Sequence, residues 1–528
     1  MQPQFTITFL ILLITISAYS QKSSLSVDQI EQHAIHFQWD KLDKDQVVLK
    51  YGLTEALELG EVKGFHLTGL TEATFYYVKA STTNKNNPIE TETQLFTTAS
   101  SSSGDIMVYF NQSVDNNASS IANATQITAF EDTIIAYINR AQSTLDICNY
   151  NTGSLPIITA INSVANAGIT VRYIAADNTG TNNGELSNLS SSIPMIQRPN
   201  DGEVMHHKFM IIDAANAALA TLVTGSVNHT DNSCHQDYNN MVILKDQALA
   251  LAYEIEFEEM WGSTGNIPNA SNAKFGADKT DNTPHLFSVG GVSVELYFSP
   301  SDGTTAQIER AILSANTDMQ FGMFTFINND LGDAVVSIQN AGVAVKGIIE
   351  NQFYWGSEYN KLANAGVDIH SHFFESHSFH HKYGLIDANN IASDPMVITG
   401  SHNWTNSAED DYDENTLIIH DATITNLYYE EFMARYAEIT GLVKVNKVAS
   451  TELVRVYPNP IQNVLNIHSD TTIEQLIVSN AFGKIVFRAE EIQNKTHQLD
   501  VRSFPAGVYF VSIYTSSKTV TIKTIKNK

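Results

Sequence analysis

Cysteine is scarce in this sequence, which contains only Cys148 and Cys234 among 528 residues. Two cysteines cannot build a disulfide framework, and neither stands in the closely spaced pairs that bind structural zinc. Both fall in the same half of the central region, so one disulfide could form between them in an oxidising compartment. Two small buried residues are the other interpretation, and the sequence leaves both interpretations open.

Basic residues are also few, because 30 Lys and Arg stand against 57 Asp and Glu, which gives a formal net charge of −27. Such a charge favours solubility and opposes long-range attraction to polyanions such as duplex DNA and anionic membranes. The charge therefore argues against a nucleic-acid substrate, although an acidic chain can still contain a local basic cleft.

Long hydrophobic runs are missing as well. An apolar stretch from Phe9 to Ile16 is too short to span a bilayer, and small residues at Ala18 and Ser20 follow it. We therefore expect a signal peptide at residues 1–20, although no Lys or Arg precedes the stretch; a buried N-terminal strand is the alternative. We expect no transmembrane segment in the mature chain, which should be exported through the periplasm and be secreted or held at the cell surface.

Hydrophobic residues make up 43% of the chain, enough to bury sizeable cores, and the length predicts several domains. Residues 24–99 contain short alternating strands separated by turn residues, the pattern of a β-sandwich. This segment resembles a fibronectin type III module in its core tryptophan, its tyrosine corner and its closing strand (Trp39, Leu70-x-x-x-Thr74-x-Tyr76 and Phe96-Thr97-Thr98). A serine-rich linker at residues 100–104 ends it.

An internal repeat organises the central region, where strands alternate with helical stretches as in an α/β layer fold. Ala167-Gly168 recurs as Ala341-Gly342, and His206-His207-Lys208 recurs as His380-His381-Lys382. The two offsets agree, since 342 − 168 and 380 − 206 both give 174. We therefore expect two tandem lobes, each an α/β/α sandwich, at residues 106–262 and 291–440, with a connector between them.

Residues 451–528 return to short strands. Three sequence elements follow in order, namely Val456-Tyr457-Pro458-Asn459-Pro460, Asn480-Ala481-Phe482-Gly483-Lys484 and Ala506-Gly507-Val508-Tyr509-Phe510. These elements closely resemble the C-terminal sorting domain of the type IX secretion system. The resemblance implies an address that the secretion machinery reads at the outer membrane and usually removes; an ordinary accessory β-module is the alternative. The expected fold class is thus an α/β centre flanked by all-β sandwiches.

Both lobes contain the same chemical groups. A strand-like run opens with His206-x-Lys208 in the first lobe and with His380-x-Lys382 in the second. Because side chains alternate along a strand, the imidazole and the ammonium of each pair share one face. A Gly-Ser-x-Asn turn follows in each lobe (Ser226 and Asn228; Ser401 and Asn403). Gathered in one cleft, these groups would form a donor-rich pocket for a phosphate.

Two copies of His-x-Lys-x₄-Asp, each followed by Gly-Ser-x-Asn, resemble the phospholipase D superfamily. The resemblance implies a phosphodiesterase in which one histidine attacks phosphorus and the other protonates the leaving group. By that resemblance His206 is the nucleophile and His380 the general acid. The groups expected to hold the phosphoryl oxygens are Lys208, Lys382, Asn228 and Asn403. No metal or other cofactor is expected, and a monomer is expected because both half-sites lie in one chain.

Nearby acidic residues are expected to support the site. Asp213 and Asp387 lie an odd number of positions from their histidines, so a regular strand turns them away and favours a structural role. The resemblance also implies an acidic residue after Gly-Ser-x-Asn that orients the imidazole. Glu414 fits this role in the second lobe, whereas Asn239 occupies the aligned position in the first. We hypothesise that Asp237 orients the first-lobe histidine instead.

The leading functional hypothesis is a secreted enzyme that hydrolyses the head-group phosphodiester of a phospholipid. A secreted, metal-independent endonuclease of the same superfamily is the alternative, and the acidic balance of the chain weighs against it. A non-catalytic surface-binding protein would tolerate degenerate motifs, yet both copies of each motif are complete. Substrate assays with lipid and with nucleic acid separate these three hypotheses.

Overall fold

The computed structural model describes residues 25–39, 42–83, 89–177, 183–441, 454–458, 461, 463–480, 484–490, 492–515 and 519–526. The expected signal peptide lies outside the described residues, as do Asn459-Pro460 and Ala481-Phe482-Gly483 of the C-terminal motifs. Packing divides the chain into two compact units, Met1–Ile439 and Thr440–Lys528.

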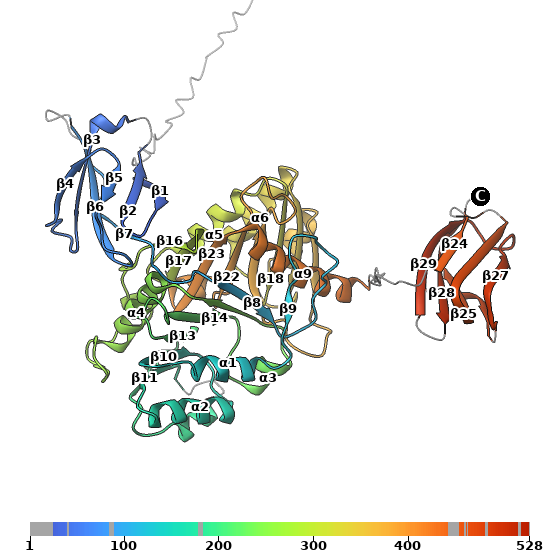
Figure 1. The fold of residues 1–528 in the computed structure, drawn as a ribbon, viewed down its shortest axis with the longest axis horizontal. Coiled ribbons are helices and arrows are strands. Elements are labelled where there is room, and N and C mark those ends of the chain that lie inside the picture. The colour runs from blue at the N-terminus through green and yellow to red at the C-terminus, as the bar shows by residue number, and fades with distance from the viewer. Residues whose placement is uncertain are drawn as a thin grey trace, which may run out of the picture. The chain divides into compact units, whose positions relative to one another are not determined.

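A β-sandwich begins the first unit (Figure 1). Its described strands form one sheet in the order β1-β2-β5 and another in the order β4-β3-β6-β7. Their bounds, with one 3₁₀ helix, are β1 (Ser26–Ile30), β2 (Ala34–Gln38), η1 (Lys44–Gln46), β3 (Val47–Gly52), β4 (Gly60–Lys63), β5 (His66–Thr68), β6 (Phe75–Thr82) and β7 (Gln94–Thr97). Trp39 is buried in the core, and the Thr71 N–H donates to Tyr76 Oη at 2.9 Å, as a tyrosine corner requires. The predicted β-sandwich is confirmed, and the fibronectin type III assignment stays a prediction.

The first α/β lobe has a mixed sheet in the order β12-β11-β10-β13-β14-β15-β8-β9. Its elements are β8 (Ile106–Phe110), β9 (Thr125–Gln126), α1 (Phe130–Ile138), β10 (Thr144–Asn149), α2 (Leu155–Asn166), β11 (Thr170–Ala175), η2 (Gly184–Asn188), β12 (Met195–Gln197), β13 (Lys208–Ile212), β14 (Thr221–Gly225), α3 (Asp231–His235), β15 (Asn240–Leu244) and α4 (Gln247–Trp261). Strands β10, β11 and β12 are parallel, whereas β13, β14, β15 and β8 pair antiparallel.

The second lobe repeats this topology in the order β16-β17-β23-β22-β21-β18-β19-β20. Its elements are η3 (Gly276–Asp278), β16 (Leu286–Val289), β17 (Val292–Ser299), α5 (Thr304–Leu313), β18 (Asp318–Met323), α6 (Asn329–Asn340), β19 (Ala344–Ile349), α7 (Tyr359–Asn364), β20 (Asp368–Ser371), β21 (Lys382–Ile386), β22 (Met396–Gly400), α8 (Asn406–Asp410), β23 (Glu414–His420) and α9 (Ala422–Thr440). Strands β20, β19, β18, β21, β22, β23 and β17 correspond to β12, β11, β10, β13, β14, β15 and β8. The predicted duplication is therefore confirmed.

The second sheet begins earlier than the sequence suggested. Strand β16 lies within the segment expected to be a connector, where it pairs antiparallel with β17. Gly290 and Gly291 join the two strands with φ values of 59° and 89°. Two consecutive glycines with positive φ permit a two-residue hairpin turn, which explains why this stretch forms strand instead of linker.

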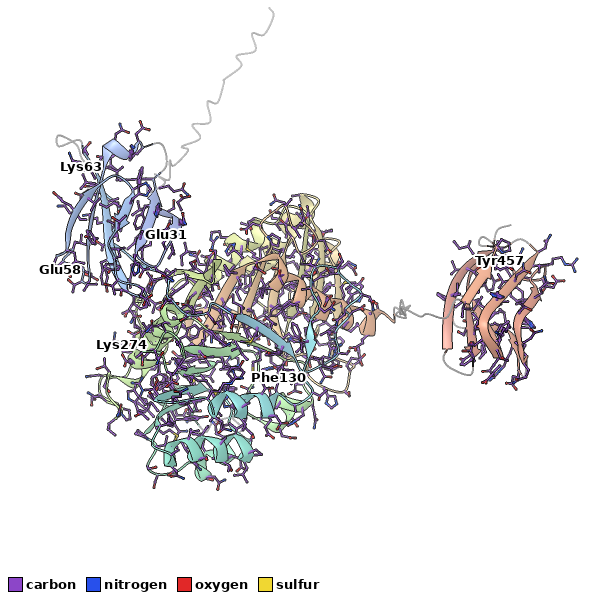
Figure 2. All side chains as sticks on the ribbon, in the orientation of Figure 1. Glu31, Glu58, Lys63, Phe130, Lys274 and Tyr457 are labelled. Carbon is purple, nitrogen blue, oxygen red and sulfur yellow. The ribbon has the colours of Figure 1, made fainter. Side chains whose placement is uncertain are left out.

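Helices and sheets alternate in layers through the two lobes (Figure 1). One face of each sheet joins α4 and α9 in a shared core, to which Phe209 and Ile211 of β13 and Leu385 of β21 belong. The opposite faces pack against α1 and α2 in the first lobe and against α5 and α6 in the second. Phe130, which begins α1 and is labelled in Figure 2, is fully buried in the outer core of the first lobe. The predicted α/β/α sandwiches are confirmed.

The two cysteines are separate buried thiols. Cys148 lies in β10 with its Sγ 3.2 Å from Met205 Sδ, and Cys234 lies in α3 with its Sγ 3.6 Å from Asn228 O. Burial raises the pKa of both thiols. Of the two interpretations open from the sequence, the structure supports two buried residues.

From Val454 onward the described elements of the second unit are β-strands. Its sheet has the order β24-β25-β28-β29, with β26 and β27 also paired to β25. The strands are β24 (Val454–Tyr457), β25 (Val464–Asn480), β26 (Ile485–Ala489), β27 (Asn494–Asp500), β28 (Gly507–Thr515) and β29 (Thr519–Lys526). Leu465, Leu476 and Val511 are fully buried in its core. Across the described part of the whole chain, no helix is long and apolar enough to cross a membrane.

Candidate active site

Each His-x-Lys pair lies where a strand enters its sheet. Lys208 begins β13 opposite Asn149 at the end of β10, and Lys382 begins β21 opposite Met323 at the end of β18. Both lysines are only 2% exposed. Because β10 and β18 are equivalent strands, the two motifs occupy the same edge of the two sheets.

Backbone contacts across the lobe interface hold the two motifs together. The His206 N–H donates to the Asp413 carbonyl of the second lobe, and the His380 N–H donates to the Tyr238 carbonyl of the first, each at 3.0 Å. A short parallel β-bridge lies at each contact. The structure thus brings the two predicted half-sites to one interface between the lobes.

The imidazole of each His-x-Lys motif contacts a side chain of the opposite lobe. His206 Nδ1 lies 2.8 Å from Glu414 Oε1, and His380 Nδ1 lies 2.9 Å from Asn239 Oδ1. Glu414 and Asn239 are both fully buried. One histidine is therefore held by a carboxylate and the other by a neutral amide.

The prediction that Asp237 orients His206 is wrong. The Asp237 carboxylate instead accepts a hydrogen bond from the Ser378 N–H at 3.3 Å, beside the second-lobe motif. The prediction assumed that each lobe supplies the partner of its own histidine. Glu414 does contact the imidazole of a motif, as predicted, but that of the opposite lobe, because the residues before β15 and at the start of β23 reach across the interface.

An aromatic ring lies beside each His-x-Lys pair. The centroid of the Tyr150 ring is 4.8 Å from that of His206 and 5.1 Å from Lys208 Nζ. The centroid of the Phe324 ring is 4.8 Å from that of His380, with the nearby ammonium 5.0 Å away. Sequence reasoning missed both aromatic residues, although 324 − 150 gives the same offset of 174 as the motifs.

The Gly-Ser-x-Asn turns position the groups that hold the imidazoles. Gly225 has φ 138°, and a Cβ there would lie 2.5 Å from the Asn240 carbonyl, so only glycine permits this approach. Ser226 Oγ donates to Asn239 Oδ1 at 2.8 Å and so fixes the amide that faces the second-lobe histidine. Ser401 Oγ accepts from the Asn415 N–H at 3.0 Å, directly after the carboxylate of β23.

Asn228 and Asn403 complete the predicted set of phosphate-binding groups. The Asn228 N–H donates to Ser233 Oγ at 2.9 Å, which fixes this turn against α3. The Oδ1 atoms of both asparagines are buried and accept no hydrogen bond from the described residues. Polar atoms buried in this state are costly, so a ligand with donor groups or bound water would stabilise them.

The aspartates of the motifs bind backbone instead of facing the site. Asp213 accepts hydrogen bonds from the N–H groups of Gln142, Ser143 and Thr144 at 2.7–2.9 Å. Asp387 likewise accepts from the N–H groups of Asn316, Thr317 and Asp318. Both aspartates have positive φ values, of 50° and 52°, which aspartate tolerates better than most residues. Each closes the loop that precedes a central strand.

A buried polar network lies behind the two half-sites. His207 Nε2 is 2.8 Å from Glu256 Oε1 in α4, and its Nδ1 accepts from Asn415 Nδ2 at 3.2 Å. His381 repeats these contacts with Glu431 in α9 and with Asn240 Nδ2. His207 and His381, the middle residues of the two motifs, therefore connect β13 and β21 to both lobes.

Burial dominates the electrostatics of the site. It lowers the pKa of His206 and of His380 well below the ordinary value, and the charges of Lys208 and Lys382 lower both further. Burial also lowers the pKa of Lys208 to about 7 and that of Lys382 well below its usual range. An anion among these groups would favour their protonated forms, so the arrangement is suited to bind a phosphate.

Comparison with known families agrees with this geometry. Residues 134–261 and 308–436 match the family described as cardiolipin synthase, PLD-like domain. The two matched ranges contain both His-x-Lys pairs and both Gly-Ser-x-Asn turns. The two lobes belong to the phospholipase D superfamily. Each lobe carries one copy of the domain of this superfamily.

The curated relatives match about a quarter of the chain. The mitochondrial cardiolipin hydrolase of Mus musculus is 31% identical over 134 residues, which is 25% of this chain and 58% of that protein. The human enzyme of the same name is 30% identical over 133 residues, 25% of this chain and 50% of that protein. This chain thus spans about half the length of the curated relatives it matches.

Two solved structures with the phospholipase D fold are similar to parts of the chain. The phospholipase D family member Nuc from Salmonella typhimurium is 25% identical, with 28% of this chain and 94% of Nuc covered and a TM-score of 0.24. Phosphatidylserine synthase from Haemophilus influenzae is 14% identical, with 64% of this chain and 92% of that chain covered and a TM-score of 0.45.

The C-terminal unit has a family of its own. Residues 455–527 match the secretion system C-terminal sorting domain, which confirms the predicted type IX sorting domain. A domain of this family indicates export and a secreted or surface location for the phospholipase D-like lobes.

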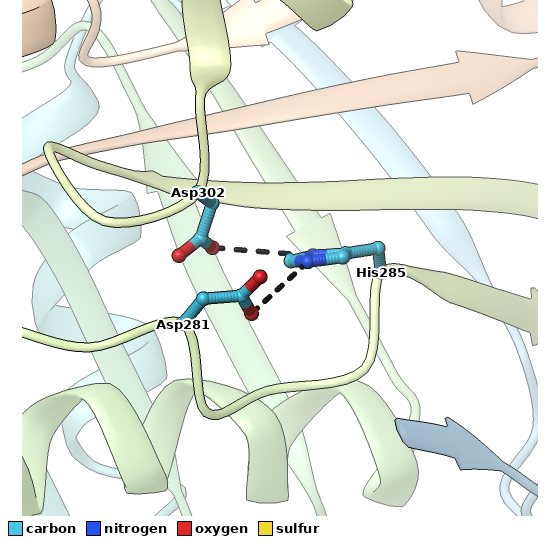
Figure 3. Close-up of side chains that lie close together, drawn as sticks. All are labelled: Asp281, His285 and Asp302. Carbon is cyan, nitrogen blue, oxygen red and sulfur yellow. Dashed lines mark ion pairs between the residues drawn. The ribbon is translucent and has the colours of Figure 1, made fainter. Parts of the chain in front are cut away.

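One group of possible metal ligands lies away from the two half-sites. Asp281, His285 and Asp302 converge next to β16 and β17 (Figure 3). His285 Nδ1 donates to the Leu296 carbonyl at 3.0 Å, and its Nε2 lies 3.1 Å from Asp281 Oδ1. Burial alone would lower the pKa of His285, but the hydrogen bond and charge of Asp281 outweigh it and raise that pKa. The ion pairs of His285 with Asp281 and Asp302 favour the protonated form of its ring.

Proposed function

We propose that the chain is a phosphodiesterase that forms a phosphohistidine at His206, with His380 as general acid and then general base. The unequal partners of the two imidazoles carry this proposal. An attacking imidazole becomes cationic when its Nε2 bonds to phosphorus, and the Glu414 carboxylate at its Nδ1 would stabilise that charge. A proton donor needs no such carboxylate. Because the Asn239 amide is neutral, it stabilises the protonated ring of His380 less than a carboxylate would, so His380 releases the proton at Nε2 more easily.

In the first step His206 Nε2 forms a bond to phosphorus while the bond from phosphorus to the leaving oxygen breaks. His380 gives its proton to that oxygen, so the alcohol leaves neutral. In the second step water attacks phosphorus, His380 takes one proton from the water, and the bond between nitrogen and phosphorus breaks. The products are an alcohol and a phosphate monoester, and His206 returns to its starting form.

The buried ammonium groups of Lys208 and Lys382 stabilise negative charge on the phosphoryl oxygens as the transition state forms. In the free enzyme both catalytic imidazoles are neutral at pH 7, because their pKa values are lowered. Binding of a phosphodiester anion would raise the pKa of His380 and so protonate it. The substrate thereby supplies the charge that makes its own general acid competent.

We propose a phospholipid as the substrate. The curated relatives that match this chain are named cardiolipin hydrolases, and the net charge of −27 opposes the approach of nucleic acid. The same two-histidine chemistry would cleave DNA, so a metal-independent endonuclease is the alternative outcome of the substrate test.

The catalytic roles are tested with bis(4-nitrophenyl) phosphate, a soluble diester whose leaving group needs little protonation. Wild-type protein in EDTA should turn over continuously. His380→Ala should release one equivalent of nitrophenol and then stall, because no general base activates water, whereas His206→Ala should release none. His235→Ala, on the partly exposed helix α3, is the control and should behave as wild type. A burst from His206→Ala with none from His380→Ala would reverse the assignment.

The substrate class is tested with phosphatidylcholine vesicles and with single- and double-stranded DNA, all in EDTA. Release of choline that His206→Ala abolishes would support a phospholipase D. Cleavage of DNA alone would establish the endonuclease, and inactivity towards every diester would favour a binding protein.

We also propose roles for the flanking segments. Residues 24–99 space the enzyme from a surface or bind one, and residues 451–528 are read by the type IX secretion machinery and removed. Both half-sites lie in one chain, so we expect the mature enzyme to act as a monomer. Light scattering of the mature protein checks this expectation.

A further inference from the structure

Five aromatic side chains gather on the protein surface beside the second half-site. We name Phe353, Tyr354, Trp355, Phe373 and Phe374 the aromatic rim; all five are exposed, from 43% for Tyr354 to 96% for Trp355. The ring centroids of Phe353, Phe373 and Phe374 lie 5.2–6.3 Å from one another. A contiguous exposed patch of this kind costs solubility and marks an interaction site.

The aromatic rim stands next to the catalytic site. It is formed by the loops after β19 and β20, which run parallel to β18, so both loops leave the edge at which β21 begins. The Gln352 N–H donates to Ser371 Oγ at 3.3 Å and joins the two loops. Glu350 Oε2 accepts from the N–H of Phe379 at 2.8 Å, directly before His380.

His372 connects the second loop of the rim to the site more closely. This side chain is only 2% exposed, and it directly precedes Phe373. Its ring centroid lies 4.7 Å from that of Tyr238 and 5.4 Å from that of Phe379. The carbonyl of Tyr238 is the acceptor for the backbone N–H of His380. Tyr238 and Phe379 therefore contact both the second loop of the rim and the backbone at His380.

Charge around the aromatic rim selects among possible partners. From Glu350 to Phe379 the sequence has four Asp and Glu residues, Glu350 included, and one Lys, Lys361, with no Arg. Sites for single-stranded nucleic acid combine aromatic rings with a positively charged groove. This segment has too few Lys and Arg residues to form such a groove. Tryptophan, tyrosine and phenylalanine without basic neighbours suit the interface of a membrane that has no net charge.

Building on the proposed phosphodiesterase function, we propose that the aromatic rim inserts into the surface of a zwitterionic phospholipid bilayer. Insertion places the lipid head groups beside His380 and lets the buried lysines receive the phosphate of a lipid still embedded in its layer. The rim supplies adsorption to the surface and the four motif side chains supply chemistry. Hydrolysis of a soluble diester does not use the rim.

Trp355 is a built-in reporter of this contact. The chain has four tryptophans, and the other three, Trp39, Trp261 and Trp404, are 3%, 0% and 1% exposed. Addition of phosphatidylcholine vesicles to the full chain should shift the tryptophan emission to shorter wavelength, and lipids with a brominated acyl chain should quench it. Trp355→Ser should abolish both effects. An emission change with single-stranded oligonucleotides and none with vesicles would overturn the proposal in favour of base stacking.

Rim variants separate adsorption from chemistry. Phe353→Ser/Phe374→Ser should lower vesicle binding, measured by flotation, and choline release from vesicles about tenfold or more, because two aromatic side chains that would enter the lipid are lost. Hydrolysis of bis(4-nitrophenyl) phosphate should stay at the wild-type rate. The control Ile267→Ser/Ile391→Ser removes side chains that are 69% and 68% exposed in other loops, and should change neither assay.

These assays distinguish two kinds of failure. If the wild-type protein does not hydrolyse the soluble diester, the proposed function is refuted. The fluorescence and flotation assays measure binding alone, so they still test whether the aromatic rim inserts into lipid. Wild-type activity on both substrates with no effect of Phe353→Ser/Phe374→Ser on vesicles would refute the rim alone.

Discussion

Replacing Lys208 by methionine should make the protein more stable and inactive at once. Lys208 Nζ is buried and donates to the carbonyl of His206 at 2.7 Å, and no carboxylate among the described residues is in hydrogen-bond contact with it. Burial lowers its pKa from 10.5 to about 7. At about 1.4 kcal/mol per unit of pKa, this fall corresponds to roughly 5 kcal/mol against the folded state, and relaxation and water entry leave about 2–5 kcal/mol.

The sign and the pH window follow from the direction of the pKa change. The unfolded chain holds the Lys208 proton up to about pH 10.5, whereas the folded chain releases it near pH 7. The penalty is therefore complete below pH 7, shrinks as the pH rises, and vanishes near pH 10.5. Lys208→Met has no proton to lose, so its advantage over wild type should be largest at neutral and acidic pH.

Urea unfolding of the full chain, followed by near-ultraviolet circular dichroism from about pH 6 to about pH 9.5, measures this difference. Lys279→Met is the matched control, since Lys279 is equally buried but pairs with Glu256 and Asp413. Those carboxylates outweigh burial and raise the pKa of Lys279, so its removal should destabilise the protein by about 3–5 kcal/mol.

Two results would refute the reasoning about Lys208. Lys208→Met that is no more stable than wild type at pH 7 would show that the buried ammonium costs little. An advantage that does not shrink with rising pH would show that the methionine stabilises by packing instead of by removing a charge. Inorganic phosphate should stabilise wild type more than the variant, because the anion pairs with the ammonium.

Three further changes have distinct expected outcomes. Glu414→Gln should lower kcat on the soluble diester about 10²- to 10³-fold by removing a charge-assisted hydrogen bond, and its urea midpoint should not fall, because burial already raises the pKa of that carboxyl. Gly225→Ala should lower the unfolding free energy by about 2–4 kcal/mol, measured by thermal melting, because the new Cβ meets backbone. Asp387→Ala should destabilise the protein by about 2–3 kcal/mol at pH 7; hydrogen bonds from Ser393 and Thr317 outweigh burial and lower the pKa of Asp387, so this difference, followed by unfolding at decreasing pH, should disappear as the pH falls through the lowered pKa.

The sequence predicted the duplicated fold and the four motif side chains, because periodicity and spacing report which residues share a strand face. The same alternation correctly turned Asp213 and Asp387 away from the site. The sequence could not predict which imidazole Glu414 and Asn239 contact. Aligning the two lobes shows where each residue lies in its own lobe but not which residues of the other lobe it meets. Tyr150 was missed for a related reason, because a ring beside the site is defined by packing and not by a motif.

The exchange of partners across the interface has a consequence for the origin of the two roles. In an assembly of two identical halves, both histidines would have the same neighbour. Nothing in the free protein would then distinguish the attacking histidine from the proton donor. A fused chain can change one neighbour alone, as the pairing of His206 with Glu414 and of His380 with Asn239 illustrates. Two half-sites in one chain thus permit two otherwise equal imidazoles to take different roles.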